Sequence, residues 1–214
     1  MPTRPDRSAS PPRKRGRPKL EKNESFEKRR AEIVDIAAEV FAERGFHATT
    51  IDDLVEATGL QRGGLYHYME NKDDLLVRIH ERFIEPLLAD ARKAVGADDS
   101  PEVTLRNLAH VLINDIADYL PQVTVFLHEW RFVEQHDRWR SIRESRREFE
   151  GLISKALEEG AEQNLFKIKD VRLATLGFLG MFNYSYQWFQ PGGRVSADDL
   201  ADQFCDIFLD GIRA

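Results

Sequence analysis

The chain has 214 residues, of which 42% are hydrophobic and 32% charged, as in an ordinary globular protein with a sizeable core. It has one cysteine, which excludes an internal disulfide framework, and no apolar run is long enough to cross a bilayer. We therefore expect a cytoplasmic protein without a membrane partner.

The net charge of −6 hides a strong asymmetry along the chain. Residues 1–30 contain 11 lysines and arginines but only four acids, a net charge of +7, so the remaining residues carry −13. A basic arm on an acidic body is typical of a protein that approaches a polyanion with one end only. This distribution favours nucleic acid as a partner.

Residues 1–22 are rich in proline, arginine, lysine and serine, which predicts a disordered basic arm. Within it, residues 13–19 resemble an AT-hook, an extended segment that enters an A·T-rich minor groove. Arg15 and Arg17 would meet the negative potential of that groove, and Gly16 has no side chain to strike its wall. The alternative is a solvated tail that only aids solubility.

The next two helices are predicted by apolar periodicity and by capping residues. Residues 25–44 place apolar side chains on one face, and a glycine follows at position 45. A second short helix begins after Thr50, which with Asp53 three residues later forms a capping box. Gly59 can adopt the left-handed backbone that ends this helix and starts a turn.

A third short helix is predicted over residues 61–68, after the turn. Leu65 and Met69, four residues apart, would face inward. The outward side then carries hydrogen-bond donors, an aromatic ring and two adjacent glycines, which suits a helix in a major groove. The purely structural alternative is a helical hairpin that binds no nucleic acid.

Residues 26–76 resemble the DNA-binding domain of TetR-family transcriptional regulators. The matching residues are Ala38, Phe41, Gly45, Thr49, Thr50, Ile51, Leu54, Gly59, Leu65, Tyr66, Tyr68, Lys72 and Leu75. Gly64 departs from the pattern, because the family usually has serine, threonine or alanine there. The resemblance implies a three-helix helix-turn-helix domain over residues 23–72. Together with the arm, it implies DNA contacts by Arg15, Arg17, Thr50, Gln61, Arg62, Gly63, Gly64, Tyr66, His67, Tyr68 and Lys72.

The second part of the chain, residues 73–214, is predicted to be helical throughout, so the fold class is all-α. Pro86 should kink or interrupt the first of these helices because proline lacks a backbone donor. The predicted helices cover residues 73–95, 100–120, 121–133, 137–159, 170–190 and a last one after Ser196.

Residues 170–190 carry apolar side chains around nearly the whole circumference of a helix. Such a helix must be covered on every side, which one subunit of this size cannot do alone. We expect this helix and the last one to form a four-helix bundle with their copies in a homodimer. A helix-turn-helix that reads a two-fold operator needs such a dimer.

No catalytic or metal-binding constellation stands out, so we do not expect an enzyme, a cofactor or a metal site. His128 and Glu129 begin a zinc-protease spacing, but Phe132 occupies the position of the second histidine. The remaining candidate site is a ligand cavity within residues 100–190, although aromatic residues at helical spacing also serve as plain core. The candidate lining residues are Phe126, Trp130, Phe149, Phe178, Met181, Phe182, Asn183 and Gln187.

Residues 178–193, with residues 158–160, resemble the effector domain of TetR-type regulators of fatty-acid and sterol breakdown. Regulators of that type bind CoA thioesters, which relieve repression. The resemblance implies a transcriptional repressor that a small-molecule effector, such as an acyl-CoA thioester, releases from a palindromic operator on double-stranded DNA. The alternative is a constitutive architectural DNA-binding dimer whose second half only dimerises.

Overall fold

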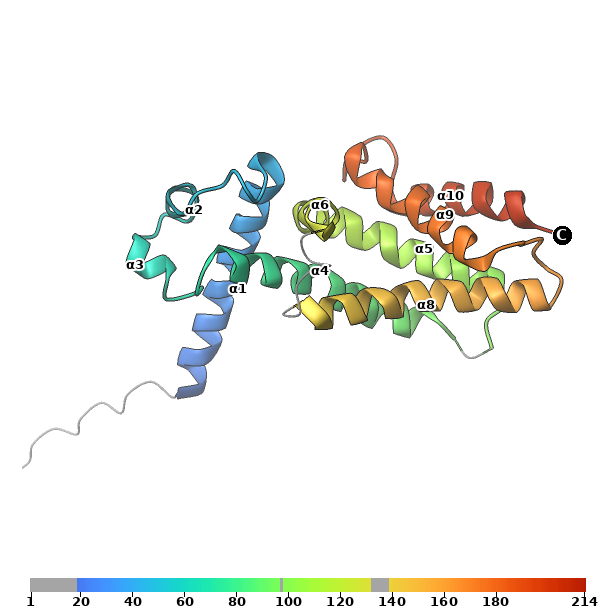
Figure 1. Ribbon diagram of the computed structural model, residues 1–214, viewed down its shortest axis with the longest axis horizontal. Coiled ribbons are helices and arrows are strands. Elements are labelled where there is room, and N and C mark those ends of the chain that lie inside the picture. The colour runs from blue at the N-terminus through green and yellow to red at the C-terminus, as the bar shows by residue number, and fades with distance from the viewer. Residues whose placement is uncertain (1–18, 97, 132–138) are drawn as a thin grey trace, which may run out of the picture.

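The computed structural model describes residues 19–96, 98–131 and 139–214, which are mainly helical (Figure 1). Within these ranges the β contact is a single isolated antiparallel bridge between Phe166 and Arg213. The predicted all-α fold is therefore confirmed.

The helices form two groups that one long helix connects. Figure 1 shows α1–α3 at one end of the molecule, α5–α10 at the other, and α4 running from the first group into the second. In chain order the elements are α1 (Lys19–Arg44), α2 (Ile51–Thr58), α3 (Arg62–Leu65), α4 (Lys72–Ala94), α5 (Pro101–Asp118), α6 (Leu120–His128), α8 (Arg140–Glu162), α9 (Val171–Asn183), the 3-10 helix η2 (Tyr184–Gln187) and α10 (Ala197–Ile212).

The predicted capping residues start the helices as expected. The Thr50 hydroxyl accepts a hydrogen bond from the Asp53 backbone N–H at 3.2 Å, and the Thr50 N–H donates to the Asp53 carboxylate at 2.7 Å. Gly59 ends α2 with a φ of 66°, in the left-handed region. Ser100 and Ser196 cap α5 and α10 in the same way as Thr50, each accepting a bond from the third residue of its helix.

Two boundaries in the N-terminal part differ from the prediction. Helix α1 begins at Lys19, so residues 19–22 of the segment predicted to be disordered are helical. Helix α3 ends at Leu65 rather than at Tyr68. Its two adjacent glycines have low helix propensity, which keeps this helix to a single turn.

Two further features of the C-terminal part also differ from the prediction. Helix α4 runs through Pro86 without interruption, because its flanking turns are buried between α5, α6 and α8. The predicted helix over residues 170–190 instead ends at Asn183 and tightens into η2. This tighter turn buries Phe189 and leaves Trp188 47% exposed.

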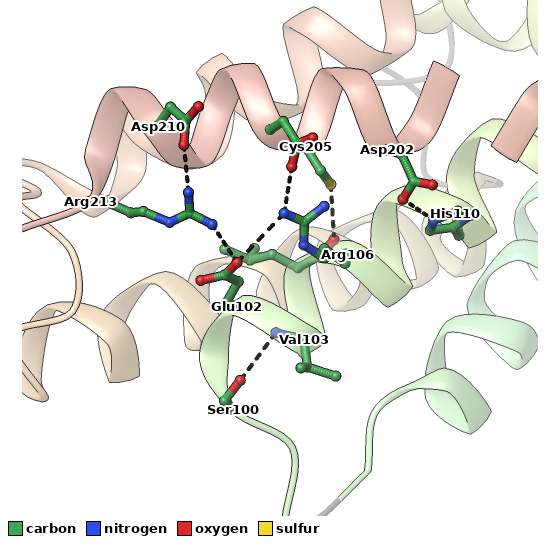
Figure 2. Close-up of polar contacts among 11 residues, drawn as sticks. Ser100, Glu102, Val103, Arg106, His110, Asp202, Cys205, Asp210 and Arg213 are labelled. Carbon is green, nitrogen blue, oxygen red and sulfur yellow. Dashed lines mark hydrogen bonds and ion pairs between the residues drawn. The ribbon is translucent and has the colours of Figure 1, made fainter. Parts of the chain in front are cut away.

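Helix α10 packs along α5 through apolar contacts and a row of ion pairs (Figure 2). Arg106 of α5 binds Asp206 of α10 at 2.6 Å, and Arg213, after α10, binds Glu102 of α5 at 2.6 Å. His110 completes the row with a contact of 2.9 Å to an aspartate of α10. These partly exposed pairs fix the register of the two helices more than they add stability.

One buried carboxyl of α5 has an unusual environment. Asp115 is 7% exposed, and its Oδ2 atom has no hydrogen-bond partner in the described part of the chain. Burial, with smaller contributions from Asp90 and Asp118, raises the pKa of Asp115 from 3.8 to about 7. The folded protein therefore holds a proton there that the unfolded chain releases near pH 4.

Stability should consequently fall as the pH rises from about 4 to about 7, since only the folded state binds this proton in that window. We predict that at pH 8 the unfolding free energy of Asp115→Asn is higher than that of the native chain by about 1–3 kcal/mol. The variant should therefore unfold at a higher temperature. At pH 5 the gain should be small. Thermal melts at both pH values measure this, with the exposed Asp98→Asn as control; an equal gain from both variants contradicts the assignment.

Candidate DNA-binding face and ligand cavity

The two short helices are held against α1 by a small apolar core. Leu54 of α2, Leu65 of α3 and Met69 just beyond it are all buried, as the sequence pattern predicts for Leu65 and Met69. Anchored in this way, α3 presents its other side to solvent. The local fold therefore positions one turn of helix as a projecting surface.

The outward side of α3 is open and lacks bulky side chains at its centre. Gln61, Arg62 and His67 are exposed, and Tyr66 is 47% exposed. A Cβ atom added to Gly63 would meet nothing within 4 Å, so the backbone itself is accessible there. Such a surface allows another molecule to approach the backbone closely.

Two predicted contact residues have partners within the protein. The Arg62 guanidinium binds the Asp52 carboxylate at 2.7 Å, in an exposed pair that a phosphate can replace at little cost. The Thr50 hydroxyl takes part in the capping box of α2 and donates to the Asp53 carboxylate at 2.6 Å.

The beginning of α1 extends the same face. The Phe26 ring stacks on Tyr68 with 5.0 Å between centroids and meets the edge of His67 at 5.2 Å. Lys28 and Arg29 line the same shallow depression. The structure thus brings these two cations of α1 next to His67 and Tyr68, a proximity that the apolar periodicity of residues 25–44 does not predict.

Lys72 has a structural role that the sequence analysis did not predict. Its ammonium donates to the carbonyl oxygens of Phe46 and Thr49 at 2.7 and 2.9 Å, and it lies 4.5 Å from the centre of the Phe46 ring. Lys72 therefore fastens the start of α4 to the turn between α1 and α2. These two hydrogen bonds use two of the three N–H donors of the ammonium.

Arg15 and Arg17, the remaining predicted DNA contacts, lie outside the described residues. Their assignment to the minor groove remains a prediction.

A second candidate site lies inside the group formed by α4, α5, α6, α8 and α9. It is an apolar cavity with about 30 Å³ of free space, enough for one or two water molecules but not for a larger ligand. Any larger occupant must therefore displace side chains. Its lining residues are Phe83, Ile84, Leu87, Leu112, Val123, Phe126, Leu127, Arg146, Phe149, Glu150, Leu179 and Asn183.

Three of the predicted ligand residues, Phe126, Phe149 and Asn183, line this cavity together. Trp130 lies just behind it, with its ring 5.6 Å from that of Phe126. The sequence pattern thus predicted residues of α6, α8 and α9 that the fold brings together.

The other four predicted ligand residues do not line this cavity. Phe178 and Phe182 are fully buried and pack toward α10, against Phe208 and Phe204 respectively. Met181 is half-buried and Gln187 is exposed on η2, which departs from the line of α9. Aromatic spacing alone could not distinguish a cavity wall from the contact between α9 and α10.

The sequence analysis missed the contribution of α4, which supplies Phe83, Ile84 and Leu87. These residues repeat at helical spacing, but the same spacing is expected of any core helix. No sequence signal singles out Arg146, because its pairing with Glu150 four residues later is matched by that of Arg140 with Glu144 on the same helix.

The cavity has one charged side. The Arg146 Nε atom donates to the Glu150 carboxylate at 2.8 Å, and the guanidinium carbon lies 3.9 Å from the centre of the Trp130 ring. Both charged side chains are mostly covered, with 27% and 31% of their areas exposed. The site therefore combines an apolar wall with a held cation and an amide.

A third surface is apolar and exposed. Leu173, Leu176 and Tyr184 follow one side of α9 and its continuation, and they are 66%, 51% and 65% exposed. Gly177 lies in the same stripe, where an added Cβ would meet nothing within 4 Å. On α10, Ile207 is 63% exposed. A stripe of this kind on two adjacent helices marks a surface for another protein.

The described residues contain no group of three or more His, Cys, Asp or Glu side chains able to hold a metal ion. None of the helices in the described ranges has the length and apolarity that crossing a bilayer requires.

Comparison with known protein families gives two matches. Residues 33–79 match the family of bacterial regulatory proteins designated tetR, and residues 98–212 match the tetracyclin repressor-like C-terminal domain. The first match contains α2, α3 and the start of α4, and the second contains α5 to α10.

Individual relatives show the same similarity over most of the chain. The HTH-type transcriptional repressor KstR2 of Rhodococcus jostii is 32% identical over 187 residues, which cover 87% of this chain and 92% of the relative. The structure of the ketosteroid transcriptional regulator KstR2 of Mycobacterium tuberculosis is 28% identical, with a TM-score of 0.81 over 87% of this chain and 95% of that one. AibR in complex with isovaleryl coenzyme A and operator DNA is 24% identical and shares the fold, with a TM-score of 0.74 over 84% of this chain and 97% of that one.

We predict that Lys72→Met lowers the unfolding free energy of the DNA-free protein by about 2 kcal/mol, because two buried carbonyl groups lose a charged donor. Urea titration measures this. Lys93→Met, an exposed lysine near the other end of α4, is the control and should change stability little. Equal stability of both variants would show that the Lys72 contacts are not structural.

Proposed function

This chain belongs to the TetR family of bacterial transcriptional regulators, and we propose that it is a homodimeric repressor that a small-molecule effector releases from a two-fold operator. The observation that carries this proposal is the position of α4. Its first residue, Lys72, holds the DNA-binding head, while Phe83 and Leu87 on the same helix form the wall of the cavity. A change in the cavity thus reaches the head through one continuous helix.

The DNA contacts follow from the projecting α3 surface. In each subunit α3 enters a major groove, where Tyr66 and His67 meet base edges or backbone and Gly63 and Gly64 permit close approach. The same face carries Gln61, Arg62, Tyr68, the Thr50 cap and the remaining donor of Lys72. Phosphate contacts from Arg62 and Lys72 position the protein without specifying sequence.

The basic arm adds a second mode of binding in this proposal. Helix α1 begins at Lys19, and Lys28 and Arg29 farther along it line the same depression as His67. Arg15 and Arg17 would then enter a minor groove that flanks the α3 contacts.

A second connection joins the cavity to the head. Asp35 of α1 receives two hydrogen bonds from Arg82 of α4, at 3.0 and 2.9 Å, and one from Gln122 of α6 at 3.0 Å. The residue after Gln122 is Val123, which lines the cavity. Displacement of α6 by an occupant therefore pulls on α1, and the effector shifts the equilibrium by its differential affinity for the two arrangements.

The exposed stripe on α9 and α10 is the proposed dimer interface. Leu176, Ile207 and Tyr184 offer apolar area, and Gly177 lets a second helix approach closely. A two-fold axis through this stripe pairs it with its own copy, which produces the four-helix arrangement and sets the separation of the two α3 helices.

The effector class is supported by the apolar lining of the cavity and by the relatives. KstR2 is described as a ketosteroid regulator, and the fold of AibR accommodates isovaleryl coenzyme A together with operator DNA. We infer an acyl-CoA thioester of lipid breakdown as effector. On this proposal the protein is not an enzyme, carries no cofactor, and works in the cytoplasm, where the DNA is.

The alternative is an architectural DNA-binding dimer without an effector. It predicts that no small molecule stabilises the protein, whereas a specific effector raises the melting temperature through its binding to the folded state.

The proposal predicts that the purified protein binds a two-fold-symmetric duplex from its own promoter region and that an acyl-CoA releases it. Fluorescence anisotropy of the labelled duplex, with and without a series of acyl-CoA thioesters, measures both steps. Free CoA at the same concentration is the control for charge. Tight binding that no thioester or other small molecule weakens would favour the architectural alternative.

We further predict that Leu176→Glu yields a folded monomer with at least tenfold weaker operator binding, because a charge at the centre of the stripe opposes its own copy across the two-fold axis. Sedimentation velocity and anisotropy measure the two effects. Leu165→Glu, another exposed leucine that lies outside the stripe, is the matched control. A dimeric Leu176→Glu protein would place the interface elsewhere.

A further inference from the structure

Contacts within the protein hold part of the Arg146 guanidinium and leave its two terminal amino groups free of hydrogen bonds within the described residues. Its Nε atom donates a hydrogen bond to Glu150, and its guanidinium carbon lies over the Trp130 ring, which in turn packs on Phe126 of the cavity wall. These contacts restrict the orientation of the group. A cation on an aromatic face at 3.9 Å, shielded from most of the solvent, is a stable arrangement.

The two terminal amino groups of Arg146 are not used by these contacts. Within the described residues they make no hydrogen bond, although the side chain lines the cavity and is only 27% exposed. A guanidinium presents its donors in a planar fork that matches the paired oxygens of a carboxylate or a phosphate. Arg146 is therefore an oriented anion receptor at the edge of an apolar space.

Asn183 provides a second polar group on the same cavity. It is the last residue of α9, it is half-buried, and its side-chain amide has no hydrogen-bond partner in the described part of the chain. An amide N–H₂ donates readily to a neutral carbonyl oxygen. The cavity thus offers one donor for a carbonyl and a fork of donors for an anion.

From this arrangement we propose that Arg146 determines the effector class: it selects an amphipathic molecule whose apolar body lies against Phe83, Phe126 and Phe149 and whose anionic group binds the Arg146 amino groups. Asn183 holds a carbonyl of the same molecule. The inference rests on the proposed function, because it names the chemistry of the effector that releases the DNA. The anion is a carboxylate or a phosphate ester, and a neutral apolar ligand is excluded as the preferred one.

Glu150 allows a second test of this proposal, because its charge is opposite to that of Arg146. Its carboxylate lies next to the position assigned to the anion, because it already accepts from Arg146 at 2.8 Å. It neutralises Arg146 in the empty cavity and repels an incoming anion. Removing the positive charge should therefore weaken anion binding, whereas removing the negative charge should strengthen it.

The test compares the full-length native chain with Arg146→Gln, Glu150→Gln and Arg140→Gln. Arg140 is the matched control, since it forms the same kind of pair with Glu144 four residues later on α8 but is 80% exposed. The probes are decanoyl-CoA, decanoate and the neutral methyl decanoate. Affinities come from isothermal titration, with the fluorescence of Trp130 beneath Arg146 as a second readout.

We expect Arg146→Gln to weaken the binding of an anionic probe by about tenfold to a hundredfold, the loss typical of a hydrogen-bonded charge. Glu150→Gln should bind the same probe more tightly than the native chain, and Arg140→Gln should equal the native chain. Methyl decanoate should bind all four proteins alike. A loss seen with decanoyl-CoA alone identifies a phosphate as the anion, a loss seen with decanoate alone identifies a carboxylate, and a loss seen with both shows that Arg146 binds either group.

Equal affinities of Arg146→Gln and Arg140→Gln for every probe would overturn the assignment, as would a loss that is the same for methyl decanoate. Failure of both anionic probes to bind the native chain would overturn it too. Operator binding without probe, measured on the same four proteins, separates this result from the proposed function. A native chain that binds no duplex refutes the repressor, whereas DNA-binding proteins that are indifferent to charge at position 146 refute only the anion receptor.

Discussion

The structure depends on α4 being a single unbroken helix that is fastened at its start and buried along its middle. At its start, the Lys72 ammonium is bonded to the carbonyl groups of Phe46 and Thr49, so the three-helix head cannot rotate without breaking those bonds. Farther along, the same helix is covered by α5, α6 and α8. A helix held in this way transmits a displacement at one end to the other. The packing around its middle also keeps the helix continuous at Pro86, although proline lacks the backbone donor.

Helices α1, α4 and α6 cannot move independently of one another, because Asp35 connects them. Asp35 accepts bonds from α4 and α6 at once, and its carboxylate cannot follow both helices if they separate. Arg82 or Gln122 must then lose its hydrogen bond to Asp35, or α1 must move. Because the Arg82 and Asp35 side chains are 42% and 37% exposed, their pair contributes on the order of 1 kcal/mol or less, and a bound ligand can drive either outcome.

Local chemistry predicted the head well and the cavity only in part. The caps at Thr50 and Gly59 depend on neighbours within a few residues, so sequence spacing is enough to find them. The role of Lys72 depends on carbonyl groups more than twenty residues away, which no local pattern reveals. For the cavity, Phe149 and Phe178 look alike in sequence, and only the packing of α10 against α9 decides that one faces the cavity and the other the core.

The charged side of the cavity is compatible with a stable fold because its two charges are paired. Without an occupant, Glu150 neutralises Arg146 and Trp130 covers its face, so no uncompensated charge is buried. An anion that enters finds donors already oriented and pays little to order them. The pair of Arg146 and Glu150 therefore has two effects. It avoids an unpaired charge in the folded protein, and it favours ligands that carry a negative group.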